Sequence, residues 1–291
     1  TAPPPSSGGT VMLAMLGMLE KDDLKNLGYG SAAYLHLLVE AMKRAFADRS
    51  QWYGDPAFVS NPTDKLLDPT YLADRRKSID PIKASKDVEP VKLPDEKLET
   101  THFTVRDRNG MIISNTYTLN GGYGSGVVVK GTGILLNNEM DDFAAKSGGT
   151  NMYGLKQGTK NLIAPKKRPL SSMTPTIVLE NGKAVLALGS PGGPTIINSV
   201  TQVLLNRLVF GMTIQEAVDA PRFHHQWSPD RILWDPNGVN PDTRRILDGM
   251  GHVFADAPNF FGDVQALAFD PERGRWTGAS DPRNGGQVSA E

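Results

Sequence analysis

The hydrophobic periodicity of this sequence changes from helical to strand-like at Thr100, and no other feature constrains the fold as strongly. Before that point, apolar residues recur at three- and four-residue steps over 31–48, behind a serine that can cap a helix, Ser31. From Thr100 to position 106 the residues alternate, an Asn109-Gly110 turn follows, and 111–119 returns as a second strand. The sequence therefore predicts a long helix in its first part and a β-hairpin that starts at Thr100.

A second hairpin is predicted over 174–188, where two apolar runs flank Asn181-Gly182-Lys183. Its outgoing strand leads into Gly189-Ser190-Pro191-Gly192-Gly193, and an apolar helix is predicted at 196–209. The charged, proline-interrupted stretch 78–99 is predicted to be an exposed connector. The other predicted elements are helices at 10–20, 71–77, 214–220 and 241–249, and strands at 265–269 and 276–279. Strands followed by separate helices favour a layered α+β or α/β/α arrangement.

The overall charge and composition exclude several classes of function. With 291 residues, the chain is long enough for one large domain or two ordinary ones, at ~150 residues per domain. Its 31 Lys and Arg residues against 32 Asp and Glu residues leave a net charge of −1, which gives no electrostatic footprint for a nucleic acid or an anionic membrane. The longest apolar run, 11–19, is far shorter than the ~20 residues of a membrane-spanning helix. We therefore expect no nucleic-acid partner and no transmembrane segment in this chain.

Several common catalytic and cofactor signatures are absent from the sequence. It contains no cysteine, which excludes disulfides, thiolate metal ligands and thiol catalysis, and it has no phosphate-binding loop, Gly-x-Ser-x-Gly elbow or His-Glu-x-x-His motif. The glycine cluster at 122–126 follows a strand but precedes no helix, which argues against a dinucleotide site. No histidine is judged to have a metal-binding spacing with a nearby carboxylate; His36 is expected on a helix face, and His224-His225 as a structural pair in a loop. We expect neither a cofactor nor a metal.

Thr100 stands out because a hydroxyl at the start of a strand follows a charged connector. A cut between Glu99 and Thr100 would create a free α-amino group with a pKa near ~7.7–8.0, which can accept the proton of the threonine's own hydroxyl. Gly192-Gly193, between a strand and a helix, could supply backbone N–H donors for a tetrahedral oxyanion. On propensity alone, however, a Thr-Thr pair is usually ordinary strand and a Gly-Gly pair an ordinary turn, so both interpretations stay open at this level.

Seven separated motifs add to this hypothesis. They are Thr-Thr-His-Phe at 100–103, Asn-Thr-Tyr-Thr-Leu-Asn at 115–120, Gly-Ile-Leu-Leu-Asn-Asn-Glu-Met-Asp-Asp-Phe at 133–143, Lys-Arg-Pro-Leu-Ser-Ser-Met at 167–173, Gly-Ser-Pro-Gly-Gly at 189–193, Ala-Pro-Arg-Phe-His-His-Gln-Trp at 220–227 and Gly-Ala-Ser-Asp-Pro-Arg at 278–283. In this order they closely resemble the γ-glutamyltranspeptidase family (glutathione hydrolases). Upstream, 3–9 and 47–56 resemble the second half of the family's large chain. We therefore expect this sequence to be an N-terminally truncated member.

The resemblance implies an α+β fold, a four-layer αββα sandwich of the N-terminal-nucleophile hydrolase type. It also implies a precursor that cuts itself between Glu99 and Thr100, so that 1–99 is the C-terminal part of the large chain and 100–291 the small chain, the two sharing one domain. Thr100 would then attack γ-glutamyl amides such as glutathione, form a γ-glutamyl ester, and pass the acyl group to water, an amino acid or a dipeptide. The family further implies a periplasmic or extracellular location.

The resemblance also implies a role for individual residues. Thr118 matches the residue that orients the nucleophile's amino group, and Gly192 and Gly193 match the oxyanion donors. Tyr153 lies in 144–158, which resembles a lid loop; an ordinary surface loop is the alternative. The substrate-binding residues implied by the match are Thr116 beside the nucleophile, Asn120, Glu139 and Asp142 for the substrate α-ammonium group, and Ser171 and Ser172 for its α-carboxylate. The family's arginine for this carboxylate lies in a part that this sequence lacks, and no residue here matches it by position.

Two alternatives remain at the sequence level. Some family members prefer glutaryl-cephalosporin side chains, which have no α-ammonium group; retention of Asn120, Glu139 and Asp142 favours a γ-glutamyl substrate. The second alternative is an inactive, unprocessed fragment whose sheets lack partner strands, so that apolar faces are exposed.

Overall fold

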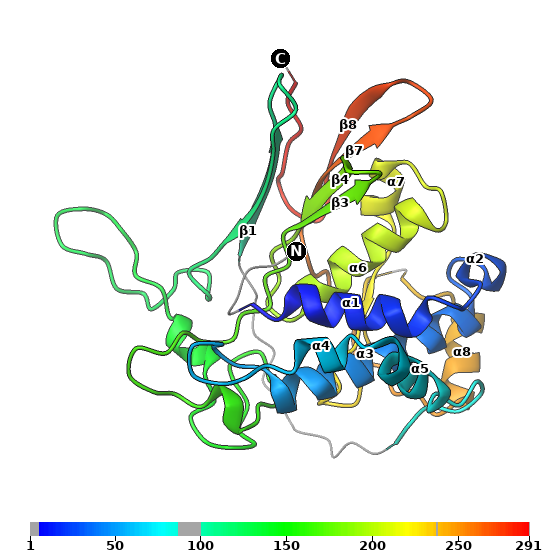
Figure 1. The fold of residues 1–291 in the computed structure, drawn as a ribbon, viewed down its shortest axis with the longest axis horizontal. Helices are drawn as coiled ribbons and strands as arrows, with labels where there is room; N and C mark the ends of the chain where they lie inside the picture. The colour runs from blue at the N-terminus through cyan, green and yellow to red at the C-terminus, as the bar shows by residue number, and fades with distance from the viewer. Residues whose placement is uncertain (1–5, 87–99, 237, 291) are drawn as a thin grey trace.

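The computed structural model describes residues 6–86, 100–236 and 238–290, and it is an α+β structure of two facing sheets with helices beside the larger one (Figure 1). The helices are α1 (Gly8–Leu19), α2 (Leu24–Leu27), α3 (Ala32–Trp52), α4 (Thr63–Leu66), α5 (Pro69–Lys77), α6 (Thr195–Leu208), α7 (Ile214–Asp219) and α8 (Pro241–Gly249), with single 3₁₀ turns η1 (Glu139–Asp142) and η2 (Thr159–Asn161). The strands are β1 (Thr101–Arg106), β2 (Ile112–Tyr117), β3 (Thr176–Glu180), β4 (Lys183–Gly189), β5 (Phe223–His224), β6 (Leu233–Trp234), β7 (Gln265–Asp270) and β8 (Arg275–Ser280). The sequence predicted neither α2 and α4 nor β5 and β6, because two to four residues are too few to show a period.

Helix α3 is the central helix of the first part of the chain. It begins as predicted, because the Ser31 hydroxyl accepts a hydrogen bond from the Tyr34 N–H over 3.1 Å. It ends at Trp52, beyond the predicted position 48, because Arg49 and Ser50 are buried and bonded to distant segments. Helix α1 packs against α3, and both bury apolar faces in a core that also includes α6 and α7.

Both predicted hairpins are present. Strands β1 and β2 pair antiparallel, with Thr101 opposite Tyr117, and form a two-stranded sheet. Strands β3 and β4 belong to a four-stranded antiparallel sheet in the order β3-β4-β7-β8. Asn181 and Gly182 connect β3 to β4 with positive φ angles of 50° and 76°, as a two-residue turn between twisted strands requires.

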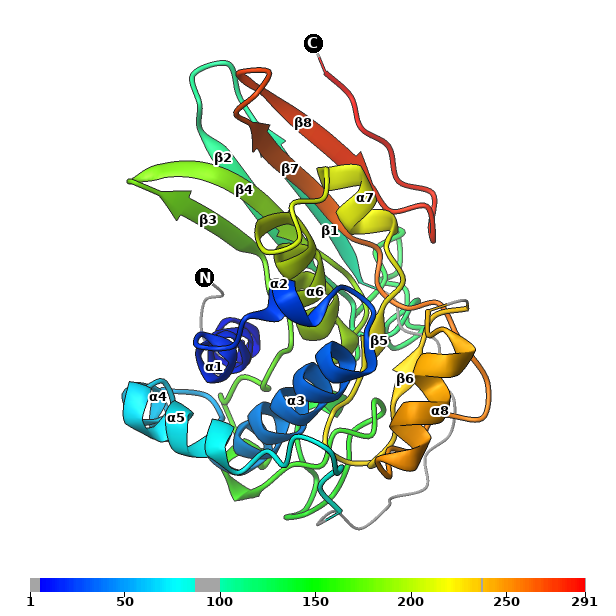
Figure 2. The ribbon, with the colours of Figure 1, turned by 90° about the vertical axis from the view of Figure 1, so that its right-hand side faces the viewer.

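The β1–β2 hairpin faces the middle of the larger sheet, and α6 and α7 lie on that sheet's other side (Figure 2). Leu186 and Leu188 of β4 belong to the core that contains α6, whereas Gly189 contacts the hairpin through His102. The central strand β4 is therefore covered on both faces, and hairpin, sheet and helices form three successive layers.

The opposite face of the hairpin carries exposed apolar side chains, Phe103, Val105, Ile113 and Tyr117. Within the described parts of the chain, no helix covers these side chains. The α+β sandwich itself is as expected.

The predicted exposed connector, 78–99, needs a correction in its first part. Ile79 and Ala84 are buried, and Arg44 of α3 donates hydrogen bonds to the hydroxyl of Ser78 over 2.8 Å and to its carbonyl over 2.6 Å. Polar side chains of α3 thus give backbone partners to a stretch whose charges suggested exposure. The remaining positions, 87–99, including Glu99 of the predicted cut, lie outside the described residues.

Candidate active site

Thr100 lies directly before β1, and the register of the hairpin places it opposite Thr118 just after β2. The two hydroxyl oxygens are 3.2 Å apart, within hydrogen-bonding distance. The Thr118 hydroxyl also accepts a hydrogen bond from the backbone N–H of Asn120 over 2.8 Å, which fixes its rotamer. A nucleophile at Thr100 would therefore have an orienting hydroxyl on the neighbouring strand.

One step along the hairpin, Thr116 pairs with a residue that the sequence did not single out for the site. His102 is opposite Thr116, and its Nδ1 lies 2.8 Å from the Thr116 hydroxyl. His102 is buried, and this burial lowers its pKa to about 4, so the imidazole is neutral at neutral pH. The only signal in the sequence was the position of His102 two residues after Thr100, which puts both side chains on the same face of the strand.

Gly192 and Gly193 form the turn between β4 and α6. Their φ angles are 129° and 53°, which residues with a side chain rarely adopt, and the Gly192 carbonyl accepts a hydrogen bond from the Thr195 hydroxyl over 2.8 Å. Among the described residues, no acceptor is found for the N–H group of Gly192 or of Gly193. Two backbone donors without a partner, before the N-terminus of a helix, suit a developing oxyanion.

Glu139 and Asp142 are the two ends of the turn η1. Burial, together with the neighbouring charges of Glu139 and Asp141, raises the pKa of Asp142 to about 7, although the charge of Arg49 opposes this rise. Burial also raises the pKa of Glu139, whose Oε1 atom has no hydrogen-bond partner among the described residues. Two desolvated carboxylates of this kind would be stabilised by an added cation such as an ammonium group.

Asn120 and Tyr153 connect the hairpin to the predicted lid. Asn120 is buried with a φ of 73°, and the Tyr153 hydroxyl donates to its carbonyl over 2.8 Å and also contacts its side-chain oxygen. Asn151 of the same loop donates to Asp142 Oδ1 over 3.1 Å, and Leu155 is buried in the core. The segment 144–158 is therefore docked onto the predicted site at several points.

Hydrogen bonds from the N-terminal segment and from α3 hold Ser171 and Ser172 in place. The Ser7 hydroxyl donates to the Ser171 carbonyl over 2.9 Å, and Arg49 donates to the Ser7 hydroxyl over 2.8 Å and to the Ser172 hydroxyl over 3.1 Å. Arg49 is buried, and its charge also acts on Asp142. No residue of the sequence matched the family's substrate arginine, yet the fold brings a different arginine to the edge of the predicted substrate site.

The described contacts thus connect most of the predicted site residues. Thr100 contacts Thr118, which binds Asn120; Asn120 binds Tyr153. Asn151 accepts a hydrogen bond from the Tyr153 N–H over 3.1 Å and donates one to Asp142. Gly192 and Gly193 join this group indirectly, since β4 lies against both strands of the hairpin.

A second polar cluster, formed by His36, Glu40 and His252, lies on and beside α3. His36 and Glu40 are four residues apart on one helix face, and with His252 they place possible ligand atoms within 4.8 Å of one another. The imidazole nitrogens of His36 and His252 are 2.7 Å apart, and Glu40 is bound by Lys43 over 3.0 Å and by Arg44 over 2.7 Å. The prediction that no histidine has a metal-binding spacing with a nearby carboxylate was therefore wrong. A metal ion at this cluster would, however, have to displace Lys43 and Arg44 from Glu40.

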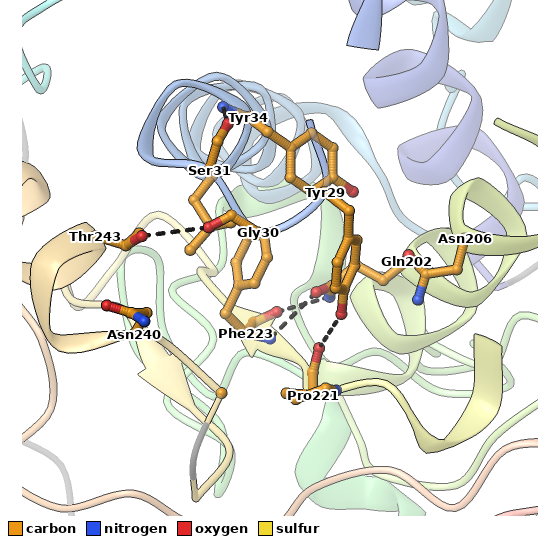
Figure 3. Close-up of a pocket in the computed structure, with 12 residues that line it drawn as sticks. Tyr29, Gly30, Ser31, Tyr34, Gln202, Asn206, Pro221, Phe223, Asn240 and Thr243 are labelled. Carbon is orange, nitrogen blue, oxygen red and sulfur yellow. Dashed lines mark hydrogen bonds between the residues drawn. The ribbon is translucent and has the colours of Figure 1, made fainter. Parts of the chain in front are cut away.

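Figure 3 shows a cavity of about 430 Å³ that is separate from these residues. Tyr29, Tyr34 and Phe223 form part of its wall, and the Tyr29 hydroxyl donates to the Pro221 carbonyl over 3.4 Å. The Tyr34 hydroxyl is buried without a partner among the described residues, and burial raises its pKa. None of the described residues that line this cavity is charged.

Comparison with known proteins gives one consistent result. The family model for gamma-glutamyltranspeptidase matches residues 1–291. A glutathione hydrolase proenzyme of Pseudomonas sp. (strain A14) is 46% identical, over 97% of this chain and 51% of its own length. The solved T380A mutant of Helicobacter pylori gamma-glutamyltranspeptidase is 48% identical, with a TM-score of 0.61 over 63% of this chain and 100% of that chain. The solved cephalosporin acylase of Bacillus halodurans is 27% identical, with a TM-score of 0.81 over 99% of this chain and 50% of that chain.

The chain spans about half the length of the curated relatives it matches, 51% and 50% for two of them. In the described ranges, every helix is too short or too polar to cross a membrane.

Proposed function

The chain belongs to the gamma-glutamyltranspeptidase family, and from that premise we propose that it carries the catalytic threonine of an enzyme that transfers or hydrolyses γ-glutamyl groups. The observation that carries this proposal is the pair formed by Thr100 and Thr118, whose hydroxyls are 3.2 Å apart at the open end of the hairpin. Glutathione is the proposed donor, since curated relatives are named glutathione hydrolase proenzymes. Water, amino acids and dipeptides are the proposed acceptors.

Self-cleavage is the first proposed step. One water hydrolyses the peptide bond between Glu99 and Thr100, so that Glu99 gains a carboxylate and Thr100 a free α-amino group, and 1–99 and 100–291 stay associated. The burial of Arg49 against Ser172 supports continued association, because this contact joins the two parts through the interior. The relatives' designation as proenzymes also supports it.

Acyl transfer then proceeds in two balanced steps. The α-amine takes the proton of the Thr100 hydroxyl, Oγ1 attacks the γ-glutamyl carbonyl carbon, and the C–N bond breaks as the leaving amine receives that proton. Water or an acceptor amine next gives a proton to the α-amine and attacks the ester carbonyl carbon. The bond between this carbon and Oγ1 then breaks, Oγ1 takes the proton back from the α-amine, and the γ-glutamyl group leaves on the acceptor. The N–H groups of Gly192 and Gly193 would bind the oxyanion in both steps, at ~2.7–4 kcal/mol per donor.

Substrate recognition follows from the charges around the site. Asp142 and Glu139 would bind the α-ammonium group, since both carboxyls are desolvated and, among the described residues, neither forms an ion pair. Ser171 and Ser172 would bind the α-carboxylate, with the positive charge of Arg49 behind Ser172. We expect this chemistry to take place in the periplasm or outside the cell.

The decisive experiment is expression of this chain with a gel and a turnover assay. We expect two bands separated at Thr100 and turnover of γ-glutamyl-p-nitroanilide, both lost in Thr100→Ala and both kept in the matched Thr101→Ala. Activity that survives in Thr100→Ala would contradict the mechanism. One intact, inactive band would instead indicate an unprocessed fragment, the alternative that the exposed apolar face of the hairpin favours.

A glutaryl-cephalosporin acylase is the enzymatic alternative, since a solved cephalosporin acylase shares the fold, with a TM-score of 0.81 at 27% identity. The two activities are separated by comparing rates on γ-glutamyl-p-nitroanilide and a glutaryl-cephalosporin. Asp142→Ala should reduce only the first rate, because a glutaryl group has no ammonium for Asp142 to bind.

A further inference from the structure

The two facing sheets touch at one unusually close point, between His102 of β1 and Gly189 of β4. A Cβ atom added to Gly189 would lie 2.3 Å from Cε1 and 2.4 Å from Nδ1 of the His102 ring. Such distances are far below van der Waals contact, so only glycine lets the ring lie against β4 at this spacing. The imidazole therefore acts as a spacer between the sheets.

The His102 ring is held rigidly on its own hairpin. Its Nδ1 lies 2.8 Å from the Thr116 hydroxyl and its Nε2 lies 3.0 Å from the Thr104 hydroxyl. A neutral imidazole has one donor and one acceptor nitrogen, and a hydroxyl can complement either, so both polar ends are satisfied in the buried state. A phenyl ring of similar size would leave Thr104 and Thr116 without these partners.

The contact lies at the point where the spacing of the sheets matters for chemistry. His102 is two residues after Thr100 on the same face of β1, and Gly189 is three residues before Gly192 at the end of β4. The strand that carries the proposed nucleophile thus meets the strand that leads to the proposed oxyanion donors. Displacing a reacting group by about 1 Å can reduce the rate ~100-fold, so a small change in this spacing would be costly.

We propose that His102 is a positioning residue, which sets the distance between Thr100 and the Gly192-Gly193 turn by seating its neutral ring on Gly189. This inference rests on the proposed function. A merely structural role would lower stability without a selective effect on the acyl-transfer step. A spacer should instead change kcat and leave KM nearly unchanged, because Asp142, Glu139, Ser171 and Ser172, which are proposed to hold the charged groups of the substrate, lie on other segments.

The test is a double-mutant cycle with Gly189→Ala, His102→Ala and the double variant. Gly189→Ala should lower kcat for γ-glutamyl-p-nitroanilide ~100-fold with KM changed less than about 3-fold, since the new methyl group pushes the ring and the sheets apart. His102→Ala should lower kcat about 10-fold. The double variant should recover about 10-fold over Gly189→Ala, because the methyl group then occupies space that the ring has left.

Controls separate this inference from folding and from the proposed function. Gly249→Ala, where an added Cβ meets nothing within 4 Å, should change neither kcat nor Tm appreciably. His102→Gln keeps hydrogen-bonding groups toward the threonines and should fold even if His102→Ala does not; its kcat should still fall. Independent, additive effects in the cycle, or losses in Tm with kcat intact, would overturn the spacer role. A wild-type chain that neither cleaves nor turns over substrate would instead reject the proposed function, and this inference would fall with it.

Discussion

Arg49 donates a hydrogen bond to the hydroxyl of Ser172 over 3.1 Å, although the two residues are 123 positions apart and lie on either side of the proposed cut. Burial lowers the pKa of Arg49 to about 10, so the side chain stays charged at neutral pH, and the charge of Asp142 favours that state. A buried cation whose nearest partners are hydroxyls is costly on its own. The contact therefore makes the first part of the chain a structural component of the proposed substrate site.

Replacing Arg49 should destabilise the protein in a way that depends on Asp142. Arg49→Met should lower the free energy of unfolding by about 1–3 kcal/mol, because it leaves the hydroxyls of Ser7 and Ser172 without their buried donor and removes the charge that favours ionised Asp142. Arg49→Lys should cost less, since it keeps the charge. Urea unfolding measures both, with Arg245→Met as the exposed control. In an Asp142→Asn background the cost of Arg49→Met should shrink by about 1–2 kcal/mol; an unchanged cost would show that the two charges do not interact.

Asp142 should make stability depend on pH. Its pKa rises from an ordinary 3.8 to about 7 on folding, so between these values the native state holds a proton that the unfolded state has lost, and stability falls as pH rises through this window. Asp142→Asn removes this dependence. The free energy of unfolding of this variant, relative to that of the wild type, should increase with pH, by up to about 4 kcal/mol above pH 7. Urea unfolding at pH 4–8 measures the difference; parallel curves would contradict it.

The same shift predicts a pH dependence of substrate binding. Only the ionised carboxylate of Asp142 can pair with an ammonium group, and its ionised fraction falls about tenfold per pH unit below its pKa. KM for a γ-glutamyl donor should therefore rise about tenfold from pH 6.5 to pH 5.5. A glutaryl substrate serves as the control, because its KM should not follow this titration.

Tyr153→Phe should loosen the predicted lid. The change removes a hydroxyl that donates to the Asn120 carbonyl over 2.8 Å, and the loss of one such hydrogen bond is worth about 1 kcal/mol. Opening of 144–158 should become roughly five to ten times more frequent, measured as faster limited proteolysis within that segment. Tyr123→Phe, at an exposed position, is the matched control. Equal cleavage rates in the two variants would favour an ordinary surface loop.

Gly192→Ala should impair catalysis far more than folding. Its φ of 129° disfavours any side chain, and the added Cβ would lie 2.5 Å from the Thr195 hydroxyl, so the turn must shift its N–H donors. We expect kcat to fall ~100- to 1,000-fold, as for the loss of an oxyanion donor. Gly211→Ala, also at positive φ but with open space around it, should cost only about 1 kcal/mol in stability. Similar kcat values in both variants would remove Gly192 from the oxyanion site.

The sequence alone determined the longer local elements and the family. Helical and strand periods located α3, α6 and both hairpins, because the spacing of apolar residues reflects the geometry of one segment and needs no information about its neighbours. Ser31 and Asn181-Gly182 act on adjacent backbone, so their roles could also be predicted locally. The motif order identified the family, which the comparisons confirmed.

Only the tertiary structure decided how the site is supported. Arg49 reaches Ser172, His102 rests on Gly189, and 78–86 packs against α3, each across many residues of sequence. The raised pKa of Asp142 likewise depends on burial and on charges from separate segments. These properties arise from desolvation and close contact between side chains that the fold brings together. The spacing of apolar and polar residues along a single segment does not predict them.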